Sequence, residues 1–304
     1  TATVTVAANL TQPTAVATAP NGINCQNSTV TLNGTGSSTG SMFAYQWNTT
    51  NGNILTGDNT LNPVVNQGGT YTLVVTNEVN GCTRQVSVTV TQDQSVPVAS
   101  AGPDRVLNCY TPTLALQGTG SIGPGYTLAW SANPGGFSSG QNTMTPIVNQ
   151  PGIYTLVITN TNTGCTSSDI VEVTSDFAPP VAQIVPPDVI TCFLPNIVLD
   201  GGPSSTGPTV QYTWTGVAGG QIVGNNDQIT AMAGSAGTYR LVVRNGDNGC
   251  TAQAQVNVTA NMVHPLAEAG PAANITCQNP VVSLNGTGSS AGATYTYQWT
   301  TSNG

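Results

Sequence analysis

The chain repeats itself with a period of about 84 residues. Each unit opens with a proline, followed by a cysteine, a tryptophan, a tyrosine and a second cysteine, always in this order and at distances that vary by no more than one residue. The opening prolines are Pro13, Pro97, Pro180 and Pro265. A fixed period of this size is the signature of an array of small folding units. We therefore expect repeats at residues 13–96, 97–179 and 180–264, and the N-terminal part of a further repeat at 265–304.

The two ends of the sequence fit the same period. Residues 1–6 match the strand-like segment that follows the second cysteine of the complete units, so residues 1–12 are expected to form the last strand of a preceding repeat plus a linker. The final unit stops five residues after Trp299. We therefore interpret the 304 residues as a window from a longer array.

Within a unit, apolar residues alternate with polar ones in short runs. Tyr126, Leu128 and Trp130 are spaced by two, which places them on one face of a strand. Residues 154–159 are rich in β-branched side chains, and Asn-Gly at positions 80–81 is a hairpin signal. No helical periodicity accompanies these runs. The pattern predicts an all-β chain of tandem immunoglobulin-like β-sandwich domains in an extended array.

One tryptophan and one tyrosine recur at fixed places in the alternating segments. We expect these side chains to anchor the domain cores, because large aromatic residues dominate core packing. A sugar-stacking platform is the functional alternative for the tryptophans, and it requires exposed rings. The expected anchors are Trp47, Trp130, Trp214, Trp299, Tyr71, Tyr154 and Tyr239.

Charged residues make up only 5% of the chain, which has a net charge of −8 and no lysine. With four arginines and no basic patch, the sequence argues against binding to nucleic acid or to an anionic membrane. No apolar run approaches the ~20 residues that span a membrane. The expected partners are therefore proteins or glycans.

The seven cysteines are evenly spaced, which favours disulfides and an oxidising, extracellular setting. Zinc binding is the competing interpretation, but no Cys-x-x-Cys cluster occurs and the chain has one histidine. Pairing within a unit closes a loop worth about 4 kcal/mol in chain entropy. The predicted pairs are Cys25–Cys82, Cys109–Cys165 and Cys192–Cys250, with the partner of Cys277 outside these residues.

Residues that carry chemistry are scarce. The one histidine, His264, has no counterpart in the other units, so we expect no catalytic residue, no enzyme activity, no metal site and no cofactor. Calcium is the one ion worth considering, although no Asp-x-Asp cluster of the kind that a hard cation prefers is present. The aspartates considered are Asp58, Asp104, Asp188, Asp200, Asp227 and Asp247.

Three segments resemble a known family. Gly-Thr-Tyr-Thr-Leu-Val-Val-Thr-Asn with the following Asn-Gly-Cys-Thr (residues 69–83), Tyr-Gln-Trp (45–47) and Leu-Asn-Gly-Thr-Gly-Ser-Ser (32–38) are similar to PKD-like and related immunoglobulin-like repeats. Such repeats occur in very large surface proteins of Bacteroidota, including gliding-motility adhesins. The resemblance implies secretion to the cell surface, by the type IX route, and a role as stalk or adhesin.

Two features depart from immunoglobulin-like patterns. Antibody-type domains place the second cysteine two residues after the corner tyrosine, whereas here it lies 11 residues after. We therefore expect the bond to tie the hairpin at a domain end. The third unit has Gly-Gly-Pro-Ser at 201–204 in place of Gly-Thr-Gly-Ser, which predicts a different local turn.

The function expected from these observations is that of a structural repeat region of an extracellular cell-surface adhesin or filament, acting as a stiff, disulfide-stapled stalk. Its partners are then the neighbouring repeats of the same chain, and also sister chains if rods associate side by side. Two alternatives stay open. One is an array of glycan- or protein-binding modules acting by avidity; the other is a set of accessory repeats of a secreted enzyme.

Overall fold

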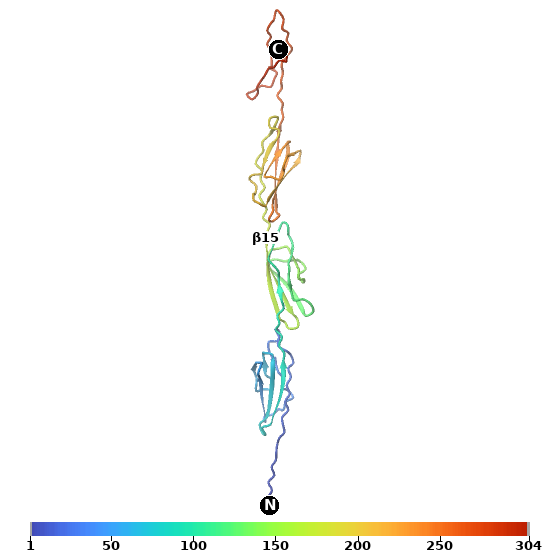
Figure 1. Cartoon of the computed structure of the whole chain (residues 1–304), viewed down its shortest axis with the longest axis vertical. Coiled ribbons are helices and arrows are strands. Elements are labelled where there is room, and N and C mark those ends of the chain that lie inside the picture. The colour runs from blue at the N-terminus through green and yellow to red at the C-terminus, as the bar shows by residue number, and fades with distance from the viewer. Residues whose placement is uncertain (1, 303–304) are drawn as a thin grey trace. The chain divides into compact units, whose positions relative to one another are not determined.

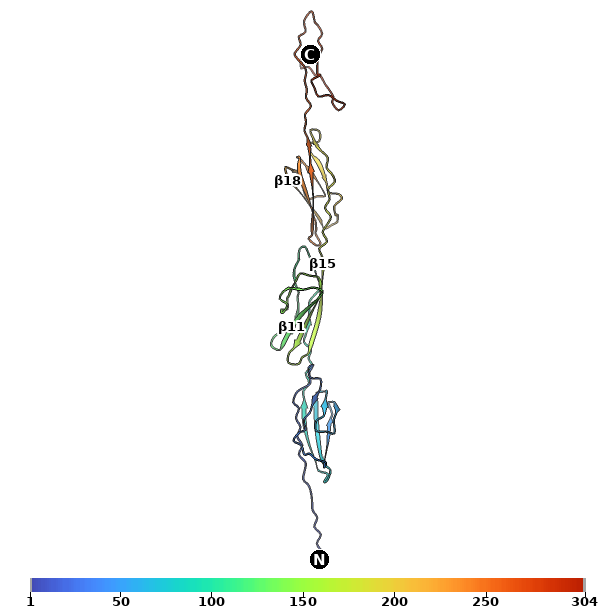
Figure 2. The same ribbon diagram turned by 180° about the vertical axis from the view of Figure 1, so that it is seen from behind.

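The computed structural model describes residues 2–302, and these residues form twenty-three β-strands and no helix. Figure 1 shows the strands gathered into successive groups along the chain, and Figure 2 shows the same groups from behind. The contacts divide the chain into two compact units, Thr1–Asp176 and Phe177–Gly304. The first unit contains strands β1 to β15, and the second contains strands β16 to β23.

The first repeat is built from two three-stranded sheets, with strand orders β1-β4-β3 and β2-β5-β6. All pairs within these sheets are antiparallel. Before them, Ile23 forms a parallel bridge with Gln92, just beyond the end of β6. The strands are β1 (Val30–Thr31), β2 (Phe43–Thr49), β3 (Ile54–Thr56), β4 (Val64–Val65), β5 (Gly69–Asn77) and β6 (Thr83–Val90).

The second repeat repeats this plan with longer pairings, in sheets ordered β12-β13-β9 and β11-β14-β15-β8 and a small pair β10-β7. β8 runs parallel to the end of β15, with Val173 opposite Arg105. The strands are β7 (Ala99–Ser100), β8 (Arg105–Asn108), β9 (Leu114–Ala115), β10 (Thr119–Gly120), β11 (Tyr126–Asn133), β12 (Phe137–Ser139), β13 (Ile147–Val148), β14 (Gly152–Asn160) and β15 (Thr166–Asp176).

The third repeat has sheets ordered β17-β20-β19 and β18-β21-β22, and a short parallel pair of β16 with β23. This pair corresponds to the bridge of Ile23 with Gln92 in the first repeat. The strands are β16 (Ile190–Thr191), β17 (Ile197–Asp200), β18 (Val210–Ala218), β19 (Ile222–Val223), β20 (Thr230–Ala233), β21 (Gly237–Asn245), β22 (Thr251–Val258) and β23 (Ala260–Asn261).

Alternation along the central strands turns one side chain in two toward the core. In β5, Tyr71, Leu73 and Val75 are fully buried, while the residues between them are not. Burying one face of each sheet against the other is what a β-sandwich requires. In each repeat, a three-stranded sheet faces the sheet that carries the tryptophan and the tyrosine. The burial pattern and these strand orders together make the chain a tandem array of immunoglobulin-like β-sandwich domains.

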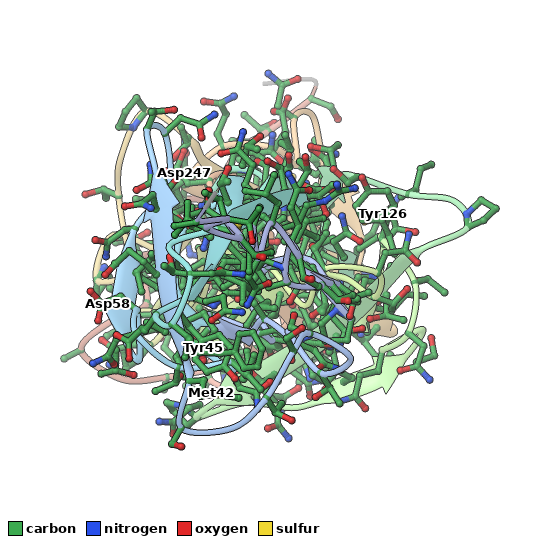
Figure 3. All side chains as sticks on the ribbon, turned by 90° about the horizontal axis from the view of Figure 1, so that it is seen from below. Met42, Tyr45, Asp58, Tyr126 and Asp247 are labelled. Carbon is green, nitrogen blue, oxygen red and sulfur yellow. A yellow bond between two sulfur atoms is a disulfide. The ribbon has the colours of Figure 1, made fainter. Side chains whose placement is uncertain are left out.

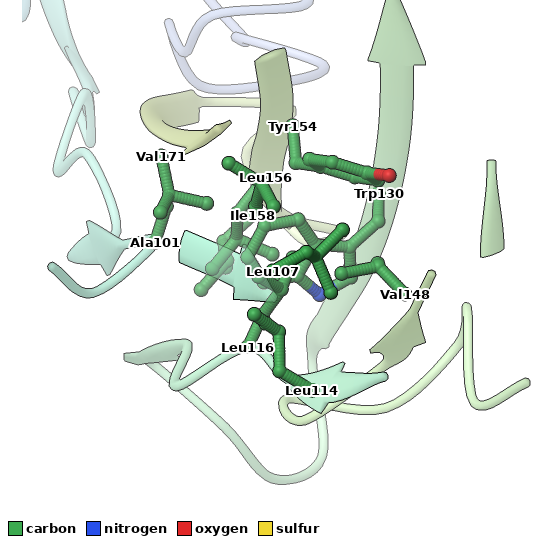
Figure 4. Close-up of a cluster of buried hydrophobic side chains, with 11 residues drawn as sticks. Ala101, Leu107, Leu114, Leu116, Trp130, Val148, Tyr154, Leu156, Ile158 and Val171 are labelled. Atoms are coloured by element: carbon green, nitrogen blue, oxygen red, sulfur yellow. The ribbon is translucent and has the colours of Figure 1, made fainter. Parts of the chain in front are cut away.

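The tryptophan and the tyrosine meet in the core of each repeat. In the second repeat, the indole N–H of Trp130 donates to the Thr143 carbonyl over 3.0 Å, and the ring of Tyr154 lies close to it in Figure 4. Tyr154 donates its hydroxyl to the carbonyl of Gln150, four residues upstream, over 2.7 Å. This is the tyrosine-corner arrangement of immunoglobulin-like domains. The same two hydrogen bonds recur at Trp47, Tyr71, Trp214 and Tyr239.

The turn at 201–204 has the same form as that of the first repeat, whereas in the second repeat Ser121 donates its N–H to the Val98 carbonyl. Ser204 donates its backbone N–H to the Gly201 carbonyl over 2.8 Å, as Ser37 does to Gly34 over 3.1 Å. The prediction of a different local turn is therefore wrong. The side chain of Ser204 also repeats the contacts of Ser37, since both hydroxyls bond the backbone of a residue 21 positions upstream.

Two segments lack the strands expected of them. Residues 2–12 form no strand, and Val4 is 89% exposed; Thr1 lies outside the described residues. In residues 265–302 no strand forms either, and Trp299 is 54% exposed. The interpretation of Trp299 as a core anchor is therefore wrong for this chain. Trp214, in contrast, is buried in a cluster to which β20 and β21, both later in the sequence, contribute.

Candidate functional site at the repeat junction

The chain carries little that could perform chemistry or hold a metal. Among the described residues, no group of three or more His, Cys, Asp or Glu side chains is placed to hold a metal ion. The carboxylate of Asp247 (Figure 3) accepts a hydrogen bond from Thr209 Oγ1 over 2.9 Å, and that of Asp104 accepts the N–H of Glu172 over 2.8 Å. These aspartates serve their local turns and strands. No helix in the described part of the chain is long and apolar enough to span a membrane.

The structure joins cysteines of different repeats. Cys25 of the first repeat forms a disulfide with Cys165 of the second, across a sequence separation of 140 residues. The predicted pairs Cys25–Cys82 and Cys109–Cys165 are therefore wrong. The pair Cys192–Cys250 is wrong as well, because Cys192 is a free thiol and Cys250 is disulfide-bonded. Cys109 is also disulfide-bonded, and Cys82 and Cys277 are free.

Strand direction explains why pairing within a repeat fails. Cys82 lies directly before β6, whereas Cys25 follows Ile23, which is bridged to Gln92 beyond the other end of that strand. Ten residues at about 3.3 Å each separate the two ends by about 30 Å. A disulfide needs its Cα atoms within about 7 Å. The two cysteines of one repeat therefore lie at opposite ends of it, and the Cα atoms of Cys25 and Cys165 are 5.0 Å apart.

A tight turn presents Cys25 at the end of the first repeat. The side-chain oxygen of Asn24 accepts the backbone N–H groups of Gln26 and Asn27 over 3.0 and 2.8 Å. The backbone N–H of Asn24 in turn donates to the Asn27 carbonyl over 2.9 Å. Asparagine favours such turns because its short side chain can replace a backbone acceptor. The turn holds Cys25 exposed, where a neighbour can reach it.

The partner surface is the hairpin between β14 and β15. Thr163 and Cys165 are 5% and 1% exposed, and the carbonyl of Thr163 accepts the N–H of Gln26 over 3.2 Å. Gly164 has a φ of +71°, a conformation that favours glycine. A Cβ at this position would collide with the side chain of Gln26. The junction therefore combines a disulfide, one backbone hydrogen bond and a close contact between Gly164 and the side chain of Gln26.

The linker that leaves the first repeat is held against the same turn. Ile23 donates its N–H to the Thr91 carbonyl over 2.8 Å, and the N–H of Asp93 donates to the Ile23 carbonyl over 2.9 Å. The carboxylate of Asp93 accepts the N–H of Ser95, and this hydrogen bond lowers the pKa of Asp93 below its ordinary value. The chain is thus fixed to its own repeat for several residues before it enters the next one.

The structure also brings together three residues that the sequence did not connect, Cys192, Met262 and His264. The Nδ1 atom of His264 lies 3.6 Å from the sulfur of Cys192, and the sulfur of Met262 lies 3.8 Å from it. His264 and Met262 are 72 and 70 positions from Cys192 in the sequence. Only the parallel pairing of β16 with β23 places them side by side.

Comparison with known proteins gives similarity of fold only. No protein-family model matches the chain, and no curated protein matches it. An I-band fragment of titin is 12% identical at a TM-score of 0.33, covering 83% of this chain and 99% of the fragment. The three N-terminal domains of the highly immunogenic outer capsid protein of bacteriophage RB49 are 12% identical at a TM-score of 0.34, covering 82% and 99%.

The N-terminal eight Ig domains of Down syndrome cell adhesion molecule are 13% identical at a TM-score of 0.34, and the match covers 84% of this chain but 36% of that one. The assignment of the fold rests on the strand orders and not on these likenesses. Fold and junction together define the class: an array of immunoglobulin-like repeats in which a disulfide joins one repeat to the next.

Proposed function

We propose that this chain is the structural repeat region of an extracellular cell-surface adhesin or filament, and that the disulfide between successive repeats carries mechanical tension. The observation that carries the proposal is the bond between Cys25 and Cys165. Its domains are the repeats at 13–96, 97–179 and 180–264. Its partners are neighbouring repeats and, in a filament, sister chains.

The position of the disulfide determines which residues bear tension when the chain is stretched. Cys25 lies in the N-terminal segment of the first repeat, and Cys165 directly precedes β15, the last strand of the second. Tension applied before Cys25 and after β15 therefore passes through the disulfide and along β15. Residues 26–164 lie inside a covalent loop outside this path. Two β-sandwich cores are thereby shielded from extension by a single bond.

Three further features support an extracellular stalk. Disulfides persist in oxidising compartments and are rare in the cytosol. The linker after the first repeat is held by the hydrogen bonds of Ile23 and Asp93, which limits bending between the first two repeats. The resemblance of residues 69–83 to surface-protein repeats points to the same setting.

Single-molecule force spectroscopy tests the proposal. The whole chain, tethered at its two ends, is stretched with and without a thiol reductant. Releasing the 140-residue separation should add up to about 500 Å of extension only after reduction, at 3.3–3.6 Å per residue. Because Cys109 inside this loop is also disulfide-bonded, a variant that carries both Cys25→Ser and Cys109→Ser should give the long extension without reductant. Equal extension of the oxidised wild type and of this double variant would refute the shielding of these repeats.

A further inference from the structure

We propose that the third repeat carries a docking face for a second copy of this chain, and that Arg240 on this face pairs with Glu172 on the second repeat of that copy. The inference rests on the proposed function, because it names the contact through which sister chains associate side by side. Both residues lie on the outward faces of the sheets that carry the tryptophans, well inside the sequence and far from its two ends.

The outward face of β21 carries an arginine where the other repeats carry threonine. Arg240 and Val242 alternate with the three buried residues of this strand, so their side chains point away from the core. The residue that follows the corner tyrosine is Thr72 in the first repeat and Thr155 in the second. The chain has only four basic residues, so a cation in the middle of a sheet face is a distinct feature of the third repeat.

No acidic side chain lies opposite Arg240 on its own sheet. Its neighbours across the strands are Thr215 on β18 and Gln255 on β22. The Nε atom of Arg240 and the Oγ1 atom of Thr215 are buried and have no hydrogen-bond partner among the described residues. Removing polar groups from water without a partner is unfavourable. The side chain of Arg240 keeps part of its surface exposed, so a carboxylate can reach it and form a charge-assisted hydrogen bond.

The outward face of β15 offers such a carboxylate among exposed aliphatic side chains. Glu172 is exposed, and Ile153 lies opposite it on β14. Ile153 and Ile170 are 46% and 60% exposed, and Val106 on the neighbouring strand β8 is 50% exposed. A contiguous apolar patch of this kind marks an interaction surface, because leaving it in water is unfavourable.

This patch is peculiar to the second repeat. The strand register places Thr70, Ser87 and Thr89 of the first repeat at the positions of Ile153, Ile170 and Glu172. The third repeat has Thr238, Gln255 and Asn257 at these positions. The fold therefore does not require aliphatic or acidic residues there, and a contact made by the second repeat alone accounts for them.

The two faces match in spacing as well as in charge. Arg240 and Val242 are successive outward residues of β21, and Glu172 and Ile170 are successive outward residues of β15. On each strand the charged residue thus stands about 7 Å from an aliphatic one. When the faces stack, Arg240 meets Glu172 while Val242 meets Ile170. Both strands have a neighbour on either side in their sheets, so the charged pair lies away from the sheet edges.

A single pair of such faces gives a weak contact. β21 has 9 residues and is therefore about 30 Å long, and three strands about 4.8 Å apart cover about 14 Å. Stacking two faces of this size removes roughly 800 Å² from water, below the ~1,200 Å² of stable complexes. Association is therefore expected at high protein concentration, and it becomes stronger where several repeats engage at once.

Sedimentation velocity of the whole 304-residue chain tests the proposal. The free thiols of Cys82, Cys192 and Cys277 are alkylated first, so that no disulfide between copies contributes. At low salt the wild type should associate reversibly as its concentration rises to about 1 mM. R240E and E172R should each raise the dissociation constant about tenfold or more, because they place like charges together. The double variant R240E/E172R exchanges the two charges and should associate as the wild type does.

Two sets of controls exclude general effects of charge and of surface polarity. E172R makes the net charge less negative, so relief of repulsion would strengthen association, whereas the proposal requires it to weaken. R84E changes the net charge as R240E does, at an exposed arginine of the first repeat, and should leave association unchanged. Ile170→Ser should weaken association several-fold, and Ile122→Ser, at an isoleucine that is 70% exposed in the loop before β11, should not.

The outcomes that would overturn the proposal are distinct. A wild type that stays monomeric, equal weakening by R84E and R240E, or a double variant that does not recover would each do so; a variant that merely misfolds is not rescued by a second substitution. Binding of polygalacturonate that R240E abolishes, with the chain monomeric throughout, would assign Arg240 to an acidic polysaccharide instead. None of these outcomes bears on the tension path through Cys25 and Cys165, which the stretching experiment tests on single molecules.

Discussion

Gly164 of the second repeat lies so close to the side chain of Gln26 in the first that a Cβ at position 164 would overlap it. We expect Gly164→Ala to destabilise the junction for two reasons. Alanine is strained at a φ of +71° by about 1–2 kcal/mol, and its Cβ also forces the side chain of Gln26 to move. The loss should appear as faster hydrogen exchange in residues 160–166, read by mass spectrometry.

Gly81 provides a matched control for this substitution. It has a φ of +70° in an equivalent hairpin but no atom within 4 Å of a Cβ at that position. Gly81→Ala should therefore show the backbone strain alone. Equal effects of the two substitutions would mean that the contact with Gln26 contributes nothing.

Removing the inter-repeat disulfide should destabilise the first two repeats together. A closed loop of the observed length contributes about 5 kcal/mol by chain entropy, and this stabilisation is lost in Cys25→Ser. Because Cys25 is exposed, the serine creates no buried polar group. Denaturant unfolding of the oxidised chain should show the transition of these repeats at lower denaturant. Cys82→Ser removes a free thiol and should leave that transition in place; a similar shift in both variants would contradict the assignment.

The hydroxyl of Tyr71 should contribute strongly to the stability of the first repeat. It donates to the Gln67 carbonyl over 2.6 Å and accepts the N–H of Asn53 over 3.0 Å. Tyr71→Phe leaves these backbone groups without their partner, at a cost of about 1–3 kcal/mol. Hydrogen exchange of the backbone amides of β5 measures this loss of stability in the first repeat. In Tyr45→Phe, which removes one bond from a half-buried hydroxyl to the Ser38 carbonyl, the loss should be smaller.

Tyr154 should make the second repeat sensitive to alkali. Burial raises the pKa of Tyr154, only partly offset by its hydrogen bond with Gly136. The folded state therefore holds this proton more tightly than the unfolded chain, so the stabilisation is complete below the ordinary tyrosine pKa of about 10 and is lost as the pH rises through the raised value. Subtracting the ultraviolet pH titration of Tyr154→Phe from that of the wild type should leave the signal of one phenol, which ionises above the ordinary tyrosine pKa of about 10. Ionisation of that phenol at or below pH 10 would contradict the prediction.

The sequence was sufficient to predict the β-sandwich because the alternation is local. Tyr126, Leu128 and Trp130 lie on one strand at period 2, and the structure places them together in β11. β8 was missed, since Arg-Val-Leu-Asn at 105–108 is too short and too mixed to stand out. Its pairing with β15 is parallel and links residues about 70 positions apart, so it leaves no local signal.

The cysteine pairing could not be derived from spacing. In a regular array, the spacing alone allows Cys25 to pair with Cys82 of its own repeat or with Cys165 of the next repeat. Only the direction of the strands shows which of the two lies near Cys25. Loop entropy favours the shorter connection by only about 0.8 kcal/mol. A local signal at the observed junction is Gly164, the residue before the hairpin cysteine, because the missing Cβ leaves room for the side chain of Gln26.

The separation of Cys25 from Cys82 also bears on how such a chain matures. As the chain emerges from its N-terminus, Cys82 becomes available to Cys25 long before Cys165 exists. Once β6 has formed, Cys25 and Cys82 stand at opposite ends of it, about 30 Å apart, and the nearer thiol is out of reach. Folding of the first repeat therefore prevents the Cys25–Cys82 disulfide and leaves Cys25 available for Cys165.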